Sequence, residues 1–337
     1  MKIAYVLSEV YAVCSFNGVR VQAQTWAEEL IKKGHEIVFV NSWEKHSWKD
    51  YDIVHIFGPV QFIRSFVEGL KSVNDEQVIV YSPIIDTNQA IWKYKLISYA
   101  GCDRLRLSTH QYNVRKCKHL INLWFVRSQY ELSYVNKAYD VPVDQIKVVP
   151  LSFRIPTIDY YPPKDDFCLH VSTLCEGRKN VMRLIDAAIK YNFKLILAGS
   201  ITEKDFIPFR EKIDANDNIQ YFGRISDEEL IDLYKRAKVF ALPSLYEGVG
   251  MVAVEAAAYG ADIVVTNLGG PKEYYGNMSF VVNPYNVDEI GKAVLLAFKS
   301  ETRQPALMNY VQTNFNISHC VDLLVEAYEM VRKPTLD

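Results

Sequence analysis

The stretch LPSLYEGVGMVAVEAAAYG, residues 242–260, is the part of the sequence that best defines the fold. The run before it, AKVFALPS, is typical of a short buried strand, and MVAVEAAAYG has the composition of a helix that ends at Gly260. Two carboxylates, Glu247 and Glu255, flank the glycine-containing turn between strand and helix. Open α/β sheets bind ligands at such turns. The stretch therefore predicts an α/β fold with a ligand site at this turn.

Apolar runs alternate with helical patterns along the whole chain, which predicts parallel sheets with crossover helices. We expect an N-terminal domain over residues 1–155 and a C-terminal domain over residues 165–312, joined by the proline-containing linker RIPTIDYYPPKDD. The fold class expected is α/β, with two doubly wound parallel-sheet domains. The strands are expected at KIAYVLS, HEIVFVN, DIVHIFG, QVIVYSP, LWFVRS and IKVVPLS in the first domain, and at FCLHVST, FKLILAG, IQYFGR, KVFALPS, DIVVTN and SFVVNP in the second.

Two helices of the second domain carry a start signal. Ser226 with Glu229, and Asn286 with Glu289, have the spacing of a capping box, in which each side chain bonds a free backbone N–H of the first turn. These pairs predict helices that begin at SDEEL and NVDEI.

Composition excludes several classes of protein. The 337 residues are 49% apolar, and 38 Lys and Arg against 40 Asp and Glu give a net charge of -2, so bulk attraction to nucleic acid is not expected. No apolar run approaches the roughly 18 residues that would span a bilayer, and we interpret MKIAYVLSEVYAV as a first strand rather than a signal peptide. The six cysteines lack metal-ligand spacing. We therefore expect a cytoplasmic protein with reduced thiols and no metal site.

The turn itself favours a phosphorylated ligand. Gly248 and Gly250 allow a tight turn, and the free N–H groups at the start of the next helix form an anion site. Glu255 could accept hydrogen bonds from the two vicinal hydroxyls of a ribose. Glu247, at the strand end, could reach a polar group on the other side of the phosphates. The pattern is thus typical of a ligand with a hydroxyl-bearing ring at each end and phosphate between them.

Two other interpretations stay open at this point. A glutamate beside a glycine turn is often a solvated loop residue, although MVAVEAAA offers little polar surface besides Glu255. Gly248, Gly250 and Ala253 also match the GxGxxA fingerprint of dinucleotide sites, but the next strand ends at Asn267 where that fingerprint needs an acid. His35 and His55 are interpreted as satisfied structural residues.

The segment LPSLYEGVGMVAVEAAAYGADIVVTNLGGPKE is similar to the E-x7-E signature region of retaining nucleotide-sugar glycosyltransferases with the GT-B fold, family 4 type, with seven residues between Glu247 and Glu255. Other segments resemble the same family in its own order: NGVRVQAQTWAEELIKKGHEI, YDIVHIFGP, RKNVMRLIDA and NIQYFGRISDEELIDLYKRAKVFALPS. The resemblance implies two Rossmann-like domains facing across a cleft. The C-terminal domain would hold the donor and the N-terminal domain the acceptor, and a last helix at about residues 317–333 would pack back on the first domain.

The same resemblance implies roles for individual residues. Glu255 would bind the ribose, Glu247 the transferred sugar, and Lys179, with the neighbouring Arg178, the diphosphate. Thr173 stands where the family usually has an arginine. The remaining donor-binding residues implied by the motifs are Gly18 beside the diphosphate, Gly223 and Arg224 beside the base, and Gly248, Val249, Gly250, Met251 and Val252 around the sugar and phosphates. The family generally needs no metal and no cofactor, since the nucleoside diphosphate sugar is a co-substrate.

One loop departs from the family pattern. Many members place a histidine facing the sugar after the fourth strand, where this chain reads YSPIIDTN and offers Asp86 as the only ionisable side chain. Asp86 therefore joins Glu247 and Lys179 as a catalytic candidate, with a plain turn or helix-cap role as the alternative.

The function expected is transfer of a sugar from a UDP or GDP donor to a hydroxyl of a glycan or lipid-linked acceptor, with retention of anomeric configuration. Such an enzyme would act in glycan, polysaccharide or glycolipid synthesis, through front-face substitution in which the departing phosphate takes the acceptor's proton. Two alternatives stay open: a nucleotide-sugar epimerase on the same fold, and a catalytically silent regulatory subunit that binds the sugar nucleotide.

Residues 89–120 form a basic segment with seven Lys or Arg and one acidic residue, Asp103. Aromatic and aliphatic residues interleave with the charges, a pattern typical of surfaces that lie on anionic lipid. We therefore expect peripheral contact with the cytoplasmic membrane face, with a solvated basic surface as the alternative. The basic residues are Lys93, Lys95, Arg104, Arg106, Arg115, Lys116 and Lys118, and the apolar residues are Trp92, Tyr94, Leu96, Ile97 and Tyr99.

Overall fold

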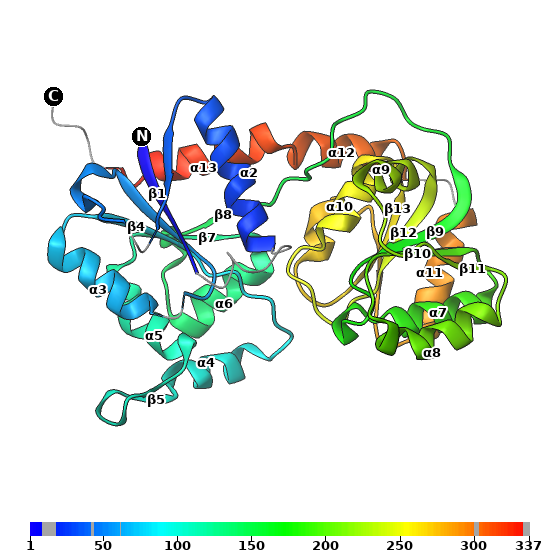
Figure 1. Cartoon of the computed structure of the whole chain (residues 1–337), viewed down its shortest axis with the longest axis horizontal. Coiled ribbons are helices and arrows are strands. Elements are labelled where there is room, and N and C mark those ends of the chain that lie inside the picture. The colour runs from blue at the N-terminus through cyan, green and yellow to red at the C-terminus, as the bar shows by residue number, and fades with distance from the viewer. Residues whose placement is uncertain (9–17, 42–43, 61, 300–302, 333–337) are drawn as a thin grey trace. The chain divides into compact units, whose positions relative to one another are not determined.

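A computed structural model describes residues 1–8, 18–41, 44–60, 62–299 and 303–332. They form two compact units, each built around one six-stranded sheet (Figure 1). The strand pairs described within these two sheets are all parallel, so the predicted α/β fold class with two Rossmann-like domains is confirmed. The described residues of the first unit lie within Met1–Ile85, Gln89–Leu151 and Ile317–Asp337. Those of the second unit lie within Asp86–Asn88 and Ser152–Asn316.

The first sheet has the order β2-β1-β3-β4-β7-β8. Its central strands β3 and β4 are buried along their whole length, because helices cover both faces and each strand is apolar apart from one buried polar residue, His55 in β3 and Ser82 in β4. The order reverses between β1 and β3, so the switch point of this sheet lies at the ends of those two strands. The strands are β1 (Lys2–Leu7), β2 (Glu36–Phe39), β3 (Ile53–Phe57), β4 (Val78–Ser82), β7 (Leu123–Val126) and β8 (Ile146–Val148).

Two hydrophobic clusters form the core of the first unit. Helices α2 and α13 cover one face of the sheet, and α3, α5 and α6 cover the other. The helices of this unit are α2 (Gly18–Lys32), α3 (Ile63–Val73), α4 (Ile91–Tyr99), α5 (His110–Cys117), α6 (Gln129–Tyr139) and α13 (Ile317–Glu329).

The last helix, α13, packs on α2 (Figure 1). Its Tyr328 hydroxyl lies 2.5 Å from Nδ1 of His55 on β3 and 3.3 Å from the Tyr5 hydroxyl on β1. All three side chains are fully buried, and Nε2 of His55 contacts the Ser82 hydroxyl at 2.8 Å. His55 is thus a structural residue with a partner on each ring nitrogen, and α13 is held by buried polar contacts to the first sheet.

The second sheet has the order β11-β10-β9-β12-β13-β14, which reverses between β9 and β12. This is the strand order of dinucleotide-binding folds, in which ligands bind beyond the carboxyl ends of the two strands at the reversal. The strands are β9 (Asp165–Val171), β10 (Leu195–Ala198), β11 (Ile219–Tyr221), β12 (Ala237–Leu242), β13 (Asp262–Thr266) and β14 (Phe280–Val282).

Helices α7, α8 and α11 pack with one face of the second sheet to form its main apolar cluster. The capping box predicted at Ser226 and Glu229 is present at the start of α9. The one predicted at Asn286 is half formed: Asn286 accepts from the N–H of Glu289, but the Glu289 carboxylate accepts from the N–H of Asn283 instead. The helices are α7 (Val181–Tyr191), α8 (Glu203–Asp214), α9 (Asp227–Arg236), α10 (Met251–Ala258), α11 (Val287–Lys299) and α12 (Ala306–Asn314).

Within the described part of the chain, no helix has both the length and the apolar character needed to cross a membrane.

Candidate functional site

The turn between β12 and α10 lies at the carboxyl end of β12, which is one of the two strands at the reversal of the second sheet. Gly250 is the N-cap of α10 and has φ +75°, and a Cβ there would lie 2.6 Å from Leu242 Cδ2. Gly269 has φ +85°, and a Cβ there would lie 2.3 Å from the backbone oxygen of Glu247. Both positions therefore require glycine, and they fix the path of the turn around Glu247.

Glu247 meets two cations from the loop that follows β9, the other strand at the reversal. Lys179 Nζ lies 2.7 Å from Oε2 of Glu247, and Arg178 Nη1 lies 3.0 Å from Oε1. The Ser244 hydroxyl donates to Oε2 at 3.3 Å, and the Glu247 side chain is only 10% exposed. Arg178 also pairs with Glu176, whose Oε2 lies 2.8 Å from Nη2, so two positive charges face two carboxylates in this cluster.

Backbone contacts hold this cation-bearing loop in place. Asn180 adopts the left-handed conformation with φ +60°, and its side-chain amide donates to the carbonyls of Pro243 and Pro284 at 2.9 and 2.7 Å. The N–H of Leu245 donates to the carbonyl of Arg178 at 2.7 Å. The two cations are therefore fixed against the turn by main-chain contacts as well as by the ion pairs.

Glu255 is the fifth residue of α10 and is 2% exposed. Arg154 donates to its Oε1 through Nε at 3.2 Å, with Nη2 at 3.1 Å, and the Tyr234 hydroxyl donates to Oε2 at 3.2 Å. Burial raises the pKa of Glu255 above its ordinary value, and Arg154 and Tyr234 oppose this shift. The sequence argument that a carboxylate in this apolar helix needs partners is thus consistent with the structure.

This arrangement can hold an anion between two carboxylates. The first N–H groups of α10, beginning at Met251, have no partner within the helix, so they favour negative charge, as do Lys179 and Arg178. A phosphate group entering here would replace Glu247 as the partner of the two cations. Glu247 and Glu255 would remain as acceptors for hydroxyl groups on either side of the turn.

The other residues predicted to bind the sugar-nucleotide donor have no contact with Glu247 that the structure describes. Gly223 has φ +70° and its carbonyl accepts from the N–H of Gly199 at 2.8 Å, while Arg224 next to it is exposed. Gly18 begins α2 in the first unit, and the preceding loop, residues 9–17, lies outside the described residues. Asp86 is exposed. The structure therefore brings together Arg178, Lys179, Glu247 and the 248–252 turn.

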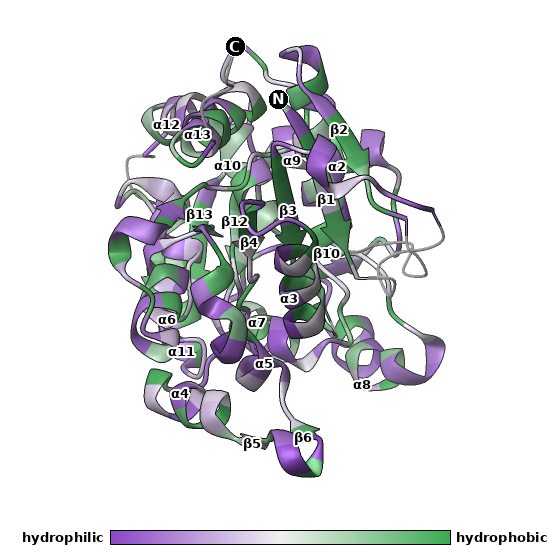
Figure 2. Cartoon of the chain, turned by 90° about the vertical axis from the view of Figure 1, so that its left-hand side faces the viewer, coloured by the Kyte–Doolittle hydropathy of each residue, from purple (hydrophilic) through white to green (hydrophobic). Residues whose placement is uncertain are grey.

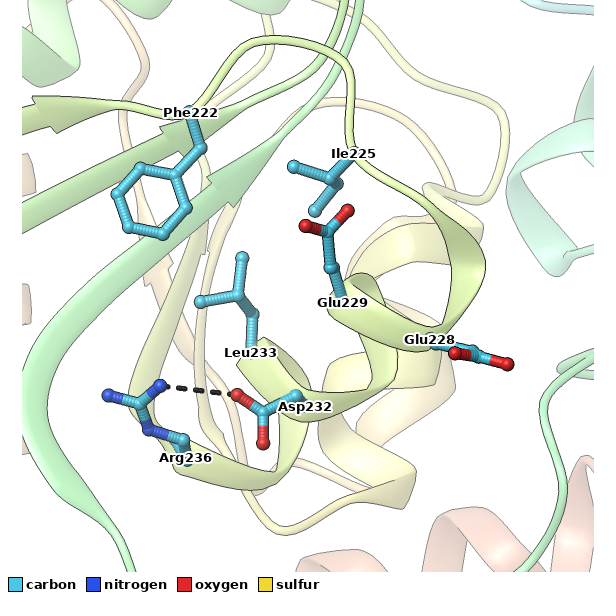
Figure 3. A pocket seen from close by; sticks show the side chains of 7 residues that line it. All are labelled: Phe222, Ile225, Glu228, Glu229, Asp232, Leu233 and Arg236. Carbon is cyan, nitrogen blue, oxygen red and sulfur yellow. Dashed lines mark hydrogen bonds and ion pairs between the residues drawn. The ribbon is translucent and has the colours of Figure 1, made fainter.

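The loop that carries Gly223 and Arg224 borders a pocket of about 370 Å³ in the second unit (Figure 3). Its floor is apolar, with Phe222, Ile225 and Leu233 pointing inward, and its rim is acidic. Of the rim carboxylates, Glu229 caps α9 and Asp232 pairs with Arg236 at 3.1 Å. The acidic rim disfavours phosphate, so we assign no donor phosphate to this pocket. Its lining residues are Phe222, Ile225, Glu228, Glu229, Asp232, Leu233 and Arg236.

The loop before Asp86 is held in an unusual conformation. Ile84 has φ +54°, which is rare for a β-branched residue. The buried carboxylate of Glu131 accepts from the N–H of Ile85 at 2.6 Å and from the N–H of Arg127 at 2.7 Å. Strain of this kind persists only where the surroundings impose it, and it is common near functional sites.

Several of these contacts could not be found from the sequence pattern. Arg154 lies in the segment interpreted as a linker, and Tyr234 lies on an ordinary amphipathic helix. Asn180 carried a usable signal, since asparagine tolerates the left-handed conformation, and Glu131 stands at capping-box spacing from Ser128.

The structure offers no group of three or more His, Cys, Asp or Glu side chains that could hold a metal ion, as far as its described residues go.

A family model described as glycosyl transferases group 1 matches residues 161–313. Residues 161–313 belong to this family. The group 1 region contains the loop after β9, the β12–α10 turn, Lys179, Glu247 and Glu255. The resemblance to GT-B glycosyltransferases predicted from the sequence is thereby confirmed, and the family 4 type is consistent with it.

Relatives of this chain include the O-antigen chain mannosyltransferase B of Escherichia coli, which is 26% identical over 230 residues. The match covers 60% of this chain and 59% of the relative, so the chain spans less than two thirds of that protein's length.

Two solved structures share the whole fold. The lipopolysaccharide outer core galactosyltransferase WaaB superposes with a TM-score of 0.74 at 16% identity, covering 98% of this chain and 99% of WaaB. The Anabaena protein Alr3699/HepE in complex with UDP has a TM-score of 0.71 at 15% identity, covering 98% of this chain and 100% of HepE. At these identities the likeness shows the fold alone.

Proposed function

We propose that this chain is a retaining glycosyltransferase that moves a sugar from a nucleoside diphosphate sugar to an acceptor hydroxyl. The observation that carries the proposal is the meeting of Lys179 and Arg178 with Glu247, at the strand reversal and beside the start of α10. The donor is a UDP or GDP sugar, and neither a metal nor a cofactor takes part.

Two features support a diphosphate at this place. Lys179 and Arg178 supply point charges, and the N–H groups at the start of α10 supply oriented donors. Without a metal, these groups must stabilise the charge that develops on the leaving diphosphate. Lys179, being the more buried of the two cations, is the main candidate for this role.

Glu255 is proposed to bind the ribose, and its present contacts constrain how. An ionised carboxylate offers about four acceptor positions, and Arg154 and Tyr234 use at least three of them. A vicinal diol needs two positions. The Arg154 guanidinium must therefore shift away from Glu255 when the ribose binds.

Glu247 is proposed to hold hydroxyls of the transferred sugar, once the phosphates have taken its cations. The chemistry is front-face substitution, in which the departing phosphate oxygen takes the proton of the acceptor hydroxyl while the protein positions both partners. Asp86 stays a prediction as the side chain facing the sugar, as do Gly18 at the diphosphate and Gly223 with Arg224 at the base.

The acceptor is proposed to be a glycan or lipid-linked sugar. One relative carries the name of an O-antigen chain mannosyltransferase, and WaaB that of a lipopolysaccharide galactosyltransferase, which supports work in polysaccharide or glycolipid synthesis. We also propose peripheral contact of residues 89–120 with the anionic cytoplasmic face of a membrane.

The test is release of nucleoside diphosphate from a panel of UDP, GDP and ADP sugars, with and without glycan acceptors, in the presence of a chelator. One donor should be consumed, and the product linkage should keep the donor's anomeric configuration in NMR spectra. Glu247→Gln should abolish most turnover, while Glu211→Gln on α8 should not change it. Interconversion of the sugar without release of nucleoside diphosphate would indicate an epimerase. Binding of the sugar nucleotide without any reaction would indicate a silent subunit.

A further inference from the structure

A small hairpin lies at one end of the first unit, between α4 and α5 (Figures 1 and 2). Its strands β5 (Gly101–Cys102) and β6 (Leu107–Ser108) are antiparallel and two residues long. A single 3₁₀ turn, Asp103–Leu105, and Arg106 with φ +53° close the tip. The hairpin is therefore a compact element that presents the four side chains from Arg104 to Leu107 in succession.

Two large aliphatic side chains of this tip face solvent. Leu105 is 65% exposed and Leu107 is 62% exposed. Three further apolar side chains on the preceding helix α4 are also largely exposed: Trp92, Leu96 and Tyr99. Concentration of five such side chains in one short segment is unusual for a surface that meets only water.

The tip also carries two exposed positive charges. Arg104 and Arg106 flank Leu105 and are exposed. The only acidic residue of the segment, Asp103, is bound at 2.8 Å by Arg64 of α3. Leucine and arginine side chains therefore alternate over four consecutive positions with a net charge of +2.

The structure also corrects the wider basic surface expected from the sequence. Lys95 and Arg115 both bind the Asp140 carboxylate at the end of α6, at 2.5 and 3.1 Å, and Lys118 donates to the carbonyl of Tyr139. Tyr94 is buried. Three of the seven basic side chains thus serve the fold, and the exposed charge that remains is Lys93, Arg104, Arg106 and Lys116.

We infer that this hairpin is the part of residues 89–120 that enters a membrane, with Leu105 and Leu107 among the acyl chains and Arg104 and Arg106 at anionic headgroups. The inference rests on the membrane contact proposed above. Burial of leucine is favourable wherever water is removed, and arginine beside an anionic leaflet adds electrostatic attraction. A protein partner fits less well, since a stable interface needs roughly 800 Å² from each side and the tip is only four residues wide.

The test is co-sedimentation of the full chain with vesicles of phosphatidylcholine alone, or of phosphatidylcholine with phosphatidylglycerol, at rising salt. The double variant Leu105→Ser, Leu107→Ser should weaken binding to the anionic vesicles by about tenfold or more at every salt concentration. The double variant Arg104→Gln, Arg106→Gln should weaken it by about tenfold at low salt, and should approach the wild type as salt screens the charges.

Matched controls lie on helices of the second unit. Ile207→Ser with Leu296→Ser removes two similarly exposed aliphatic side chains, and Lys204→Gln with Arg210→Gln removes two exposed charges. Both controls should bind vesicles as the wild type does.

Three results would overturn the inference. If the wild type ignores anionic vesicles at low salt, the membrane contact itself is wrong. If it binds them but the leucine variant binds equally well, the hairpin is not the inserting element. If the leucines instead drive self-association without vesicle binding, the hairpin is a protein interface. Nucleoside diphosphate binding, followed separately by thermal shift, tests the proposed donor site independently of all three.

Discussion

The Lys179 ammonium lies 2.7 Å from the Glu247 carboxylate, although the two residues are 68 positions apart in the chain. Each follows one of the two strands at which the order of the second sheet reverses, β9 and β12. In this structure the carboxylate takes the place that we assign to a diphosphate. Binding of donor therefore exchanges one anion for another at Lys179, and frees Glu247 for the sugar.

Nucleoside diphosphate should bind in the presence of excess chelator. Lys179, Arg178 and the first N–H groups of α10 already supply the positive charge that a divalent ion would otherwise provide. The measurement is calorimetric titration with and without EDTA. An affinity that disappears in chelator would show that a metal takes part.

Arg154→Ala should lower the stability of the free protein but increase the stabilisation by nucleoside diphosphate. The variant leaves Glu255 buried with one fewer partner, at a cost of about 1–3 kcal/mol, reduced by the partial exposure of Arg154. The ribose would then fill a position that no guanidinium occupies. Thermal shifts at saturating ligand check this, with Arg210→Ala on α8 as the control. A smaller ligand-induced shift would mean that Arg154 itself holds the donor.

Asp262 should make stability depend on pH. Burial raises its pKa to about 6, although Arg303 and Lys164 oppose the shift, and Oδ1 finds no hydrogen-bond partner among the described residues. Because the folded-state pKa lies above the ordinary 3.8, the favourable contribution is present below about pH 4 and is lost as pH rises through about 6. The full change is about 3 kcal/mol.

The variant Asp262→Asn isolates this effect. The melting temperature of the wild type minus that of the variant should fall between pH 4.5 and pH 7.5, because only the wild type acquires a buried charge. Asp217→Asn at an exposed position is the control and should show no such trend. A difference that stays constant with pH would refute the assignment.

Tyr328→Phe should destabilise the first unit by about 1–3 kcal/mol, since it leaves Nδ1 of the fully buried His55 without the hydroxyl that lies 2.5 Å away. Urea unfolding followed by far-UV circular dichroism measures the change. Tyr99→Phe, which alters an exposed ring, should cost much less. Equal effects in the two variants would show that α13 is not held through this contact.

The sequence was most informative where the pattern is local. Every predicted strand appears, because each contains a short apolar run, although only some of them, such as β3 and β4, are buried along their whole length. Gly250 is required by a positive φ that its motif implies. The Ser226 capping box is equally local. These features depend on residues within one turn or one strand of each other, so the spacing of the residues in the sequence is enough to predict their contacts.

Prediction from the sequence was weaker where partners come from distant segments. Arg154 reaches Glu255 across 101 positions, and nothing in the linker pattern marks it. The sequence predicted Lys95 and Arg115 as part of a basic surface, but in the structure both bind the carboxylate of Asp140 at the end of α6. The sequence also did not predict that the leucines of the hairpin are exposed to solvent. An isolated leucine in a sequence does not show whether its side chain is buried or exposed.

The central claim is that Glu255 and Glu247 bind opposite ends of one donor, the ribose and the transferred sugar. It is tested most directly by titrating the variants Glu255→Gln and Glu247→Gln with nucleoside diphosphate and with the sugar donor. Glu255→Gln should weaken free nucleoside diphosphate by about tenfold or more, because a charged acceptor for the ribose is lost. Glu247→Gln should bind nucleoside diphosphate at least as tightly as the wild type, since it no longer competes for Lys179, and should lose turnover instead. Equal loss of nucleoside diphosphate affinity in the two variants would contradict the account.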